Sequence, residues 1–83
     1  MRSKRLDRIP LKHRKDVESQ IRSLLKILQE QRESRGFTQE ELAERLDISV
    51  RTLQFIEQGR RFPSIPMLFY LAKLLKITVK FEK

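Results

Sequence analysis

The apolar positions between residues 16 and 35 follow the spacing of an α-helix. They recur three or four residues apart, so that they share one side of a helix: Val17, Ile21, Leu24, Leu25 and Leu28. Asp16 is a suitable N-cap because its carboxylate can accept a hydrogen bond from a free backbone N–H group. Gly36 readily adopts the left-handed conformation in which many helices end. The pattern predicts a helix from about residue 16 to residue 35.

A shorter helical pattern begins after Thr38. Thr38 and Glu41 have the spacing of a capping box, in which each side chain bonds the backbone N–H of the other residue. Three apolar residues then form a small inward face: Leu42, Ala43 and Leu46. We expect a helix over residues 39–46. Asp47 lies where the chain must turn, and Asp tolerates the left-handed conformation better than most residues other than Gly.

The next helical pattern, over residues 50–58, has an unusual outward side. It is bounded by an N-cap candidate and a stop residue, Ser49 and Gly59. Its inward positions are Leu53 and Ile56. Arg51 and Phe55 are four residues apart and therefore lie side by side on the face that remains exposed. Because a solvated face would normally carry Lys, Glu or Gln, this pair indicates a surface that contacts something other than water.

A fourth helical pattern precedes a short alternating segment. Ser64 can cap this helix, and Pro66 fits its first turn, where a missing N–H costs little. The expected inward positions are Ile65, Leu68, Leu71, Ala72 and Leu75. Apolar and polar residues alternate over residues 77–82, which is typical of a β-strand. A lone strand is unstable, so this one would pair with the same strand of a second copy, or with the chain around residues 9–12.

The formal net charge of +8 is unevenly distributed along the 83 residues. Residues 1–15 contribute +6, residues 16–46 contribute −2 and residues 47–83 contribute +4. This distribution favours a polyanionic partner, with nucleic acid first and an anionic membrane second; a merely solvated surface is the competing explanation. Residues 1–15 contain Pro10 and few apolar groups, so we expect a flexible basic arm there.

The composition argues against several classes of function. The absence of Cys argues against a disulfide scaffold and a Cys-based zinc site, and fits a reducing cytoplasm. The apolar runs are too short to span a membrane, and the N-terminus lacks the apolar region of a secretory signal. His13 is the only His and has no cluster of further metal ligands near it in the sequence. We therefore expect one domain with no enzymatic activity, no metal and no cofactor.

A long segment resembles the Cro/C1-type (XRE) helix-turn-helix domain of phage repressors and bacterial regulators: SRGFTQEELAERLDISVRTLQFIEQGRRFPSIPMLFYLAKLL. The resemblance covers about residues 21–76 and depends on Thr38, Gln39, Glu41, Leu42, Ala43, Leu46, Ile48, Leu53, Ile56, Glu57, Gly59, Pro63 and Ser64. Asp47 departs from the Gly usual in that turn. The resemblance implies an all-α, lambda-repressor-like bundle of four to five helices with a short C-terminal β-strand that pairs across a dimer.

This resemblance divides the chain into three parts. Residues 1–15 would be the basic arm, residues 16–76 the DNA-binding domain and residues 77–83 a dimerisation strand. It also implies a bacterial cytoplasmic protein associated with the nucleoid. Arg32 and Glu57 match positions that form a largely buried ion pair in the family, and breaking such a pair is costly.

The resemblance, together with side-chain chemistry, predicts two sets of contacts to double-stranded DNA. The residues expected to contact bases are Ser49, Val50, Arg51, Gln54 and Phe55. Those expected to contact phosphates are Thr38, Gln39, Thr52, Arg60 and Arg61. Arg51 has the fork that fits guanine O6 and N7, although it could also contact a phosphate or be solvated. Gln39 would bind beside the free N–H groups of a helix start. Phe55, like Val50, could pack on a thymine methyl, or Phe55 could lie against a sugar or the loop at residues 61–62.

The expected partner besides operator DNA is a second copy of the chain. The predicted dimer contacts are Met67, Tyr70, Leu74, Ile77, Val79 and Phe81. The C-terminal segment is similar to the HipB-type antitoxins, whose dimer is completed by an intersubunit β-sheet. That resemblance implies a repressor of its own operon that binds a HipA-type serine/threonine kinase toxin. The alternatives are a stand-alone phage-type or metabolic repressor, and a helical adaptor whose basic arm binds a protein or anionic lipid.

Overall fold

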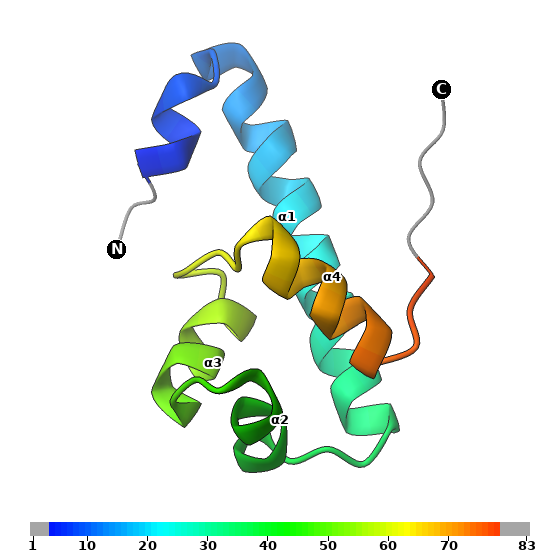
Figure 1. The fold of residues 1–83 in the computed structure, drawn as a ribbon. Helices are drawn as coiled ribbons and strands as arrows, with labels where there is room; N and C mark the ends of the chain where they lie inside the picture. Colours follow the sequence, from blue (N-terminus) through cyan, green and yellow to red (C-terminus); the bar gives the residue numbers. More distant parts are fainter. Residues whose placement is uncertain (1–3, 79–83) are drawn as a thin grey trace.

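The computed structural model describes residues 4–78, which form a bundle of helices (Figure 1). The elements in chain order are the 3-10 helix η1 (Lys4–Arg8) and the α-helices α1 (Leu11–Ser34), α2 (Gln39–Leu46), α3 (Val50–Glu57) and α4 (Ile65–Leu74). The all-α fold class is confirmed for these residues, which contain four α-helices and no strand. The predicted C-terminal strand is not supported. Ile77 and Thr78 are not in a strand, and residues 79–83 lie outside the described part of the chain.

α1 begins earlier than its apolar pattern predicts. Its N-cap is Pro10, and Asp16 lies inside the helix rather than capping it. The apolar pattern marks only the part of a helix that packs on a core, whereas a solvated turn of Lys, Arg and other good helix formers leaves no such signal. Residues 4–8 and 11–15, which the charge pattern assigned to a flexible arm, are helical.

A side chain of α1 ties η1 to the start of α1. Arg14 Nε donates to the carbonyl of Ile9 at 2.7 Å, and Arg14 Nη2 donates to the carbonyl of Asp7 at 2.8 Å. These bonds close the reversal of the chain between η1 and α1, which is visible at the blue end of the ribbon in Figure 1. η1 is therefore held against the start of α1.

The core lies where the inward faces of the four α-helices meet. Its buried apolar residues are Leu25, Leu28, Leu42, Ala43, Leu46, Leu53, Ile56, Leu71, Ala72 and Leu75. Leu24 and Ile65 were expected to face inward, but they are 39% and 66% exposed. α4 (IPMLFYLAKL) is apolar on nearly every side, so its sequence does not identify the buried face. Contacts with the other helices decide it.

Local signals at the ends of α2 and α3 are confirmed. The Thr38 hydroxyl accepts from the Glu41 N–H at 3.0 Å, and the Glu41 carboxylate accepts from the Thr38 N–H at 2.9 Å. Asp47 ends α2 in the left-handed conformation, at φ 56 and ψ 45. The Ser49 hydroxyl caps α3 by accepting from the Thr52 N–H at 3.0 Å. These caps determine the length of α2 and the start of α3 on either side of a tight turn.

Candidate nucleic-acid interface

α3 is supported from behind and leaves one side open. It packs against α2 and against α1. Leu53 and Ile56 point into the core and are 1% and 3% exposed. The short turn from α2 is tied by the Ile48 N–H, which donates to the carbonyl of Ala43 at 3.0 Å. Two short helices joined by such a turn are the helix-turn-helix arrangement, in which the second helix is presented to a DNA groove.

The residues expected to contact bases differ in how open they are. Ser49 and Arg51 are exposed, whereas Val50, Gln54 and Phe55 are half-buried. Val50 packs against the edge of the core. The Ser49 hydroxyl donates to the Thr52 hydroxyl at 2.9 Å while it caps α3. Of the α3 residues expected to contact bases, Arg51 is therefore the exposed one.

Phe55 is not bare on the surface, because two arginines lie against its ring. The guanidinium carbon of Arg51 is 5.1 Å from the ring centroid, and that of Arg60 is 4.8 Å from it. The Phe55 carbonyl also accepts from the N–H groups of Arg60 and Arg61, at 2.8 and 3.2 Å. The i, i+4 spacing made the Arg51 contact foreseeable. The Arg60 contact depends on the path of the chain after Gly59.

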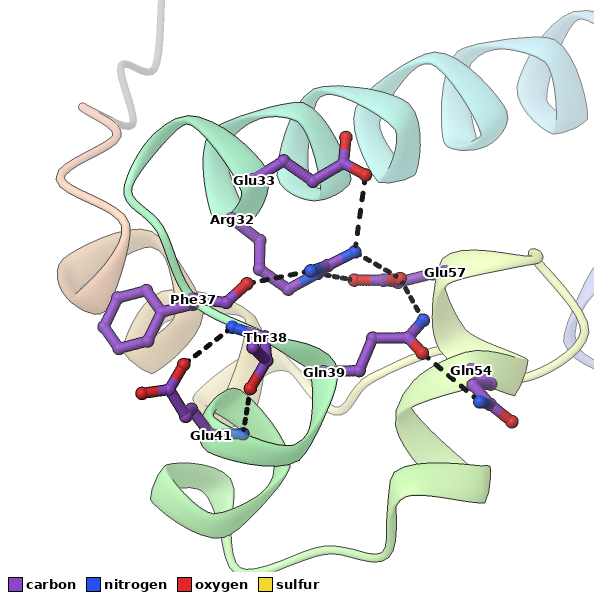
Figure 2. Close-up of polar contacts among 8 residues, drawn as sticks. All are labelled: Arg32, Glu33, Phe37, Thr38, Gln39, Glu41, Gln54 and Glu57. Atoms are coloured by element: carbon purple, nitrogen blue, oxygen red, sulfur yellow. Dashed lines mark hydrogen bonds and ion pairs between the residues drawn. The ribbon is translucent and has the colours of Figure 1, made fainter.

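A chain of polar contacts joins α1 to α3 by way of α2 (Figure 2). Arg32 Nε donates to Glu57 Oε2 at 2.6 Å, and Arg32 Nη2 donates to Glu57 Oε1 at 3.4 Å. Gln39 Nε2 donates to the same Glu57 Oε1 at 2.9 Å. Gln54 Nε2 in turn donates to Gln39 Oε1 at 3.2 Å. The buried ion pair is thus connected to the side of α3 that is expected to face DNA.

The ion pair at the centre of this chain is shielded from water. The side chains of Arg32 and Glu57 are each 8% exposed. Arg32 Nη1 also donates to the carbonyl of Phe37 at 2.9 Å, and the exposed Glu33 carboxylate lies 3.8 Å from Arg32 Nη2. Among the described residues, no buried side-chain nitrogen or oxygen lacks a hydrogen-bond partner. A satisfied network of this kind makes the joint between α1 and α3 rigid.

Gln39 has a partner at each end of its amide. Its oxygen accepts from Gln54 and its nitrogen donates to Glu57, which leaves the second N–H of the amide for another acceptor. The sequence placed Gln39 at a helix start and suggested a phosphate contact there. It carried no signal for these two partners, because they lie 15 and 18 residues away in the chain.

The other residues expected to contact phosphates lie at the ends of α2 and α3. Arg60 and Arg61 are exposed and follow α3, and Thr52 is half-buried in its first turn. Thr38 is exposed at the start of α2, where its hydroxyl is engaged with Glu41. The hydrogen bond from the Thr38 backbone N–H lowers the pKa of Glu41, with a smaller contribution from the Thr38 hydroxyl. Glu41 therefore keeps its negative charge in the first turn of α2, where the helix dipole favours it.

The comparison with protein families agrees with this geometry. A family model described as helix-turn-helix matches residues 28–81. The chain belongs to this helix-turn-helix family. Its members are DNA-binding transcription regulators, and α3 is the helix that such a domain presents to DNA. The match begins within α1, so that η1 and the first part of α1 precede the family domain.

One curated relative supports the same assignment. A protein of Methanothermobacter thermautotrophicus (strain Delta H) named "Uncharacterized HTH-type transcriptional regulator" is 39% identical to this chain over 49 residues. These residues are 59% of this chain and 71% of the relative. No solved structure matches the chain. The helix-turn-helix assignment thus rests on the family model and on this relative.

The residues expected to form the dimer contact lie on α4 and in the segment after it, and those that the structure describes are not all exposed. Met67, Leu74 and Ile77 are half-buried against the core. Tyr70 is 45% exposed, and Val79 and Phe81 lie outside the described residues. The exposed apolar side of α4 also includes Ile65, which was expected to face inward, and Phe69, for which the sequence pattern gave no expectation.

The described residues do not assemble a metal site or a membrane span. Within residues 4–78, no group of three or more His, Cys, Asp or Glu side chains is placed so that it could hold a metal ion. No helix in the same part of the chain is both long and apolar enough to cross a membrane. The chemistry that the described residues bring together is that of hydrogen-bond donors and cations around α3.

Proposed function

We propose that this helix-turn-helix protein is a sequence-specific repressor that inserts α3 into the major groove of operator DNA. The proposal depends on how α3 is packed. One side of α3 packs against α1 and α2, and the exposed residue Arg51 lies on the side that remains open. An α-helix with its side chains is about 10–12 Å in diameter, which suits a major groove about 12 Å wide.

Arg51 is the proposed reader of a guanine. Its guanidinium fork matches the O6 and N7 acceptors of guanine, and a bidentate pair of this kind discriminates by about 1–3 kcal/mol against other bases. Ser49, Val50 and Gln54 are proposed as its neighbours at the base edges. Gln54 has the amide that suits adenine, although in the protein without DNA this amide donates to Gln39.

The phosphate contacts would come from both ends of the helix-turn-helix unit. The free N–H of Gln39 lies at the start of α2, where backbone N–H groups also favour an anion. Arg60 and Arg61 lie beyond the end of α3 and would reach the strand at the other rim of the groove. Thr38 and Thr52 complete the proposed set. The net charge of +8 supports a polyanionic partner.

The proposal is tested by selecting preferred duplexes from random DNA and then comparing two arginine variants. Arg51→Ala should weaken binding to the selected duplex about 5- to 150-fold and relax the preference at one guanine. Arg45→Ala is the matched control, since Arg45 is an exposed arginine on α2 whose guanidinium lies over the ring of Phe37, 5.5 Å from its centroid. Both variants remove one positive charge. Equal losses of affinity for the two would mean that α3 does not read bases.

We further propose that two copies bind DNA together. A single helix-turn-helix unit reads few base pairs, and two-fold pairing places two recognition helices one DNA turn apart. The exposed apolar residues of α4, among them Tyr70, support a contact between copies. Sedimentation of the chain with Tyr70→Glu against Lys73→Glu, a neighbouring exposed position, tests this proposal. A monomeric wild-type protein that binds one half-site would refute it.

The narrowest proposal is that the protein is the antitoxin of a HipBA-like pair that represses its own operon. It rests on the sequence resemblance of residues 64–83 to HipB-type antitoxins, together with the repressor function above. The discriminating experiment is co-purification with the kinase, if any, encoded beside its gene. A stable complex with a HipA-type serine/threonine kinase would support it, and its absence would leave a stand-alone phage-type or metabolic repressor.

A further inference from the structure

The ring of Phe55 contacts two arginines, Arg51 and Arg60. The proposed function assigns a base contact to Arg51 and a phosphate contact to Arg60. Arg51 lies in the first turn of α3, and Arg60 lies beyond its end. Their guanidinium carbons are 5.1 and 4.8 Å from the same ring centroid, so the two cations are at most about 10 Å apart. They are nine positions apart in the sequence, and both lie against the ring of Phe55.

The arrangement on the Arg60 side is fixed by the backbone as well. The N–H groups of Arg60 and Arg61 both donate to the carbonyl of Phe55, at 2.8 and 3.2 Å. Gly59 makes this possible because it adopts φ 76, a conformation that favours glycine. The chain therefore folds back over the end of α3 and delivers the Arg60 side chain to the ring.

Two like charges at this separation interact unfavourably in the protein alone. They lie within about one Debye length at 0.1 M salt, so solvent ions screen the repulsion only in part. The negative face of an aromatic ring attracts a guanidinium group, which offsets the repulsion for each arginine. An anionic ligand would offset it further. A surface with this arrangement is suited to a partner that offers acceptors to both groups at once.

We propose that Phe55 is a positioning residue that orients Arg51 toward a base and Arg60 toward a phosphate before DNA binds. The inference rests on the proposed function, since it assigns a role within the same DNA-binding surface. A long arginine side chain loses much rotamer freedom when it binds, and a ring that already restricts it reduces that loss. Because one ring contacts both arginines, the contributions of the phosphate contact and of the base contact to the affinity for DNA depend on each other.

This role differs from a direct contact between Phe55 and a thymine methyl. In the direct role, the apolar side chain itself touches the base, and leucine could replace it. In the positioning role, the aromatic face is what matters. Phe55→Leu removes the ring and keeps an apolar side chain, whereas Phe55→Tyr keeps the ring.

The first measurement is the affinity of these variants for the selected duplex. Phe55→Leu removes the ring that restricts both arginine side chains before DNA binds and should weaken binding about 5- to 150-fold, whereas Phe55→Tyr should change it by no more than about twofold. The guanine preference should also relax in Phe55→Leu. Phe55→Ala keeps neither the ring nor a large apolar side chain, so it tests the direct contact. Replacing thymine by uracil, which lacks the methyl group, should change the affinity of the wild type and of Phe55→Ala by the same factor. A uracil effect seen in the wild type and absent in Phe55→Ala would overturn the inference.

The second measurement is a double-mutant cycle between the arginines. Arg51→Ala and Arg60→Ala leave Phe55 in place, so they serve even if Phe55→Leu unfolds. If the ring couples the two, their combined loss in affinity should differ from the product of the single losses by about threefold or more. Independent effects, multiplying within about twofold, would show that Phe55 does not couple the base contact to the phosphate contact.

A third measurement separates failure of the inference from failure of the proposed function, because it needs no DNA. The Nε–H proton signals of Arg51 and Arg60 should carry a ring-current shift that disappears in Phe55→Leu. Phe37→Leu is the control, since Phe37 contacts only the Arg45 guanidinium, at 5.5 Å, among the arginine–ring contacts of the described residues. Unchanged arginine signals would refute the stacking, whereas a wild type that selects no DNA sequence would refute the proposed function.

Discussion

Replacing Glu57 by Gln should be among the most destabilising single changes in this protein. The change removes one charge of the ion pair with Arg32 and keeps the size and shape of the side chain. In the wild-type protein, Arg32 Nε donates to the Glu57 carboxylate at 2.6 Å, and both side chains are only 8% exposed. In the variant, this guanidinium faces a neutral amide. The arginine retains its bond to the Phe37 carbonyl, but its charge has no buried partner.

The magnitude follows from the environment of the arginine. Removing one partner of a buried ion pair costs about 3–5 kcal/mol, since the remaining charge is left uncompensated. A domain of this length has a total stability of about 4–12 kcal/mol. A large part of the folding free energy would therefore be lost. Arg32→Met combined with Glu57→Leu should recover most of it, because a well-packed apolar pair avoids the desolvation of both charges.

The assay is urea unfolding followed by far-UV circular dichroism, because the chain has no Trp to serve as a fluorescent probe. The m-value should remain unchanged, so that a shift in midpoint reports stability. Glu18→Gln is the matched control. It breaks the ion pair between Arg22 and Glu18 at 2.7 Å, whose side chains are 73% and 44% exposed, and should cost less than about 1 kcal/mol. Equal losses of stability for Glu57→Gln and Glu18→Gln would refute the reasoning.

Three further predictions concern single residues. Gln39→Ala should weaken operator binding about uniformly across sequences and reduce the dependence of log affinity on log salt, measured by titration, if its free N–H contacts a phosphate; an unchanged affinity would contradict this. Asp47→Gly should stabilise the fold by about 0.5–1 kcal/mol in urea unfolding, because Asp47 has φ 56, while the same change at Asp16 inside α1 should instead cost about 0.3 kcal/mol. The pKa of Glu41 is lowered below its ordinary value of 4.5 in the folded state, so its contribution to stability is present above that value and is lost as the pH falls through the folded pKa. Below about pH 4.5, the free energy of unfolding should therefore fall less steeply with falling pH in Glu41→Gln than in the wild type. Near neutral pH, the two proteins should show the same dependence on pH.

The rigid joint between α1 and α3 gives the predicted effect of Glu57 a second consequence. Glu57 accepts from Gln39, and Gln39 accepts from Gln54 on α3. A change at Glu57 therefore removes an acceptor from a residue that is proposed to contact a phosphate. The double variant Arg32→Met, Glu57→Leu should restore stability, but it lacks this acceptor. Its free energy of unfolding should therefore be close to that of the wild type while its affinity for the operator remains lower.

Local features of this fold are well predicted from the sequence. The capping box at Thr38, the N-caps of α3 and α4 and the left-handed Asp47 depend on contacts within a few residues, and all are present. The N-terminal end of α1 was placed too late for a related reason. The turns before residue 16 touch no core, and a solvated helix of polar residues has no apolar period to detect.

The sequence by itself determined the lengths of the short helices, the turn between them and membership of the helix-turn-helix family, because caps, turns and apolar spacing act over one or two helical turns. Only the tertiary structure decided which apolar residues of α4 face outward. It also decided that the ring of Phe55 contacts Arg60 as well as Arg51, and that the Gln39 amide donates a hydrogen bond to Glu57. These contacts join residues whose distance in space depends on how whole helices pack, and no local pattern encodes that distance.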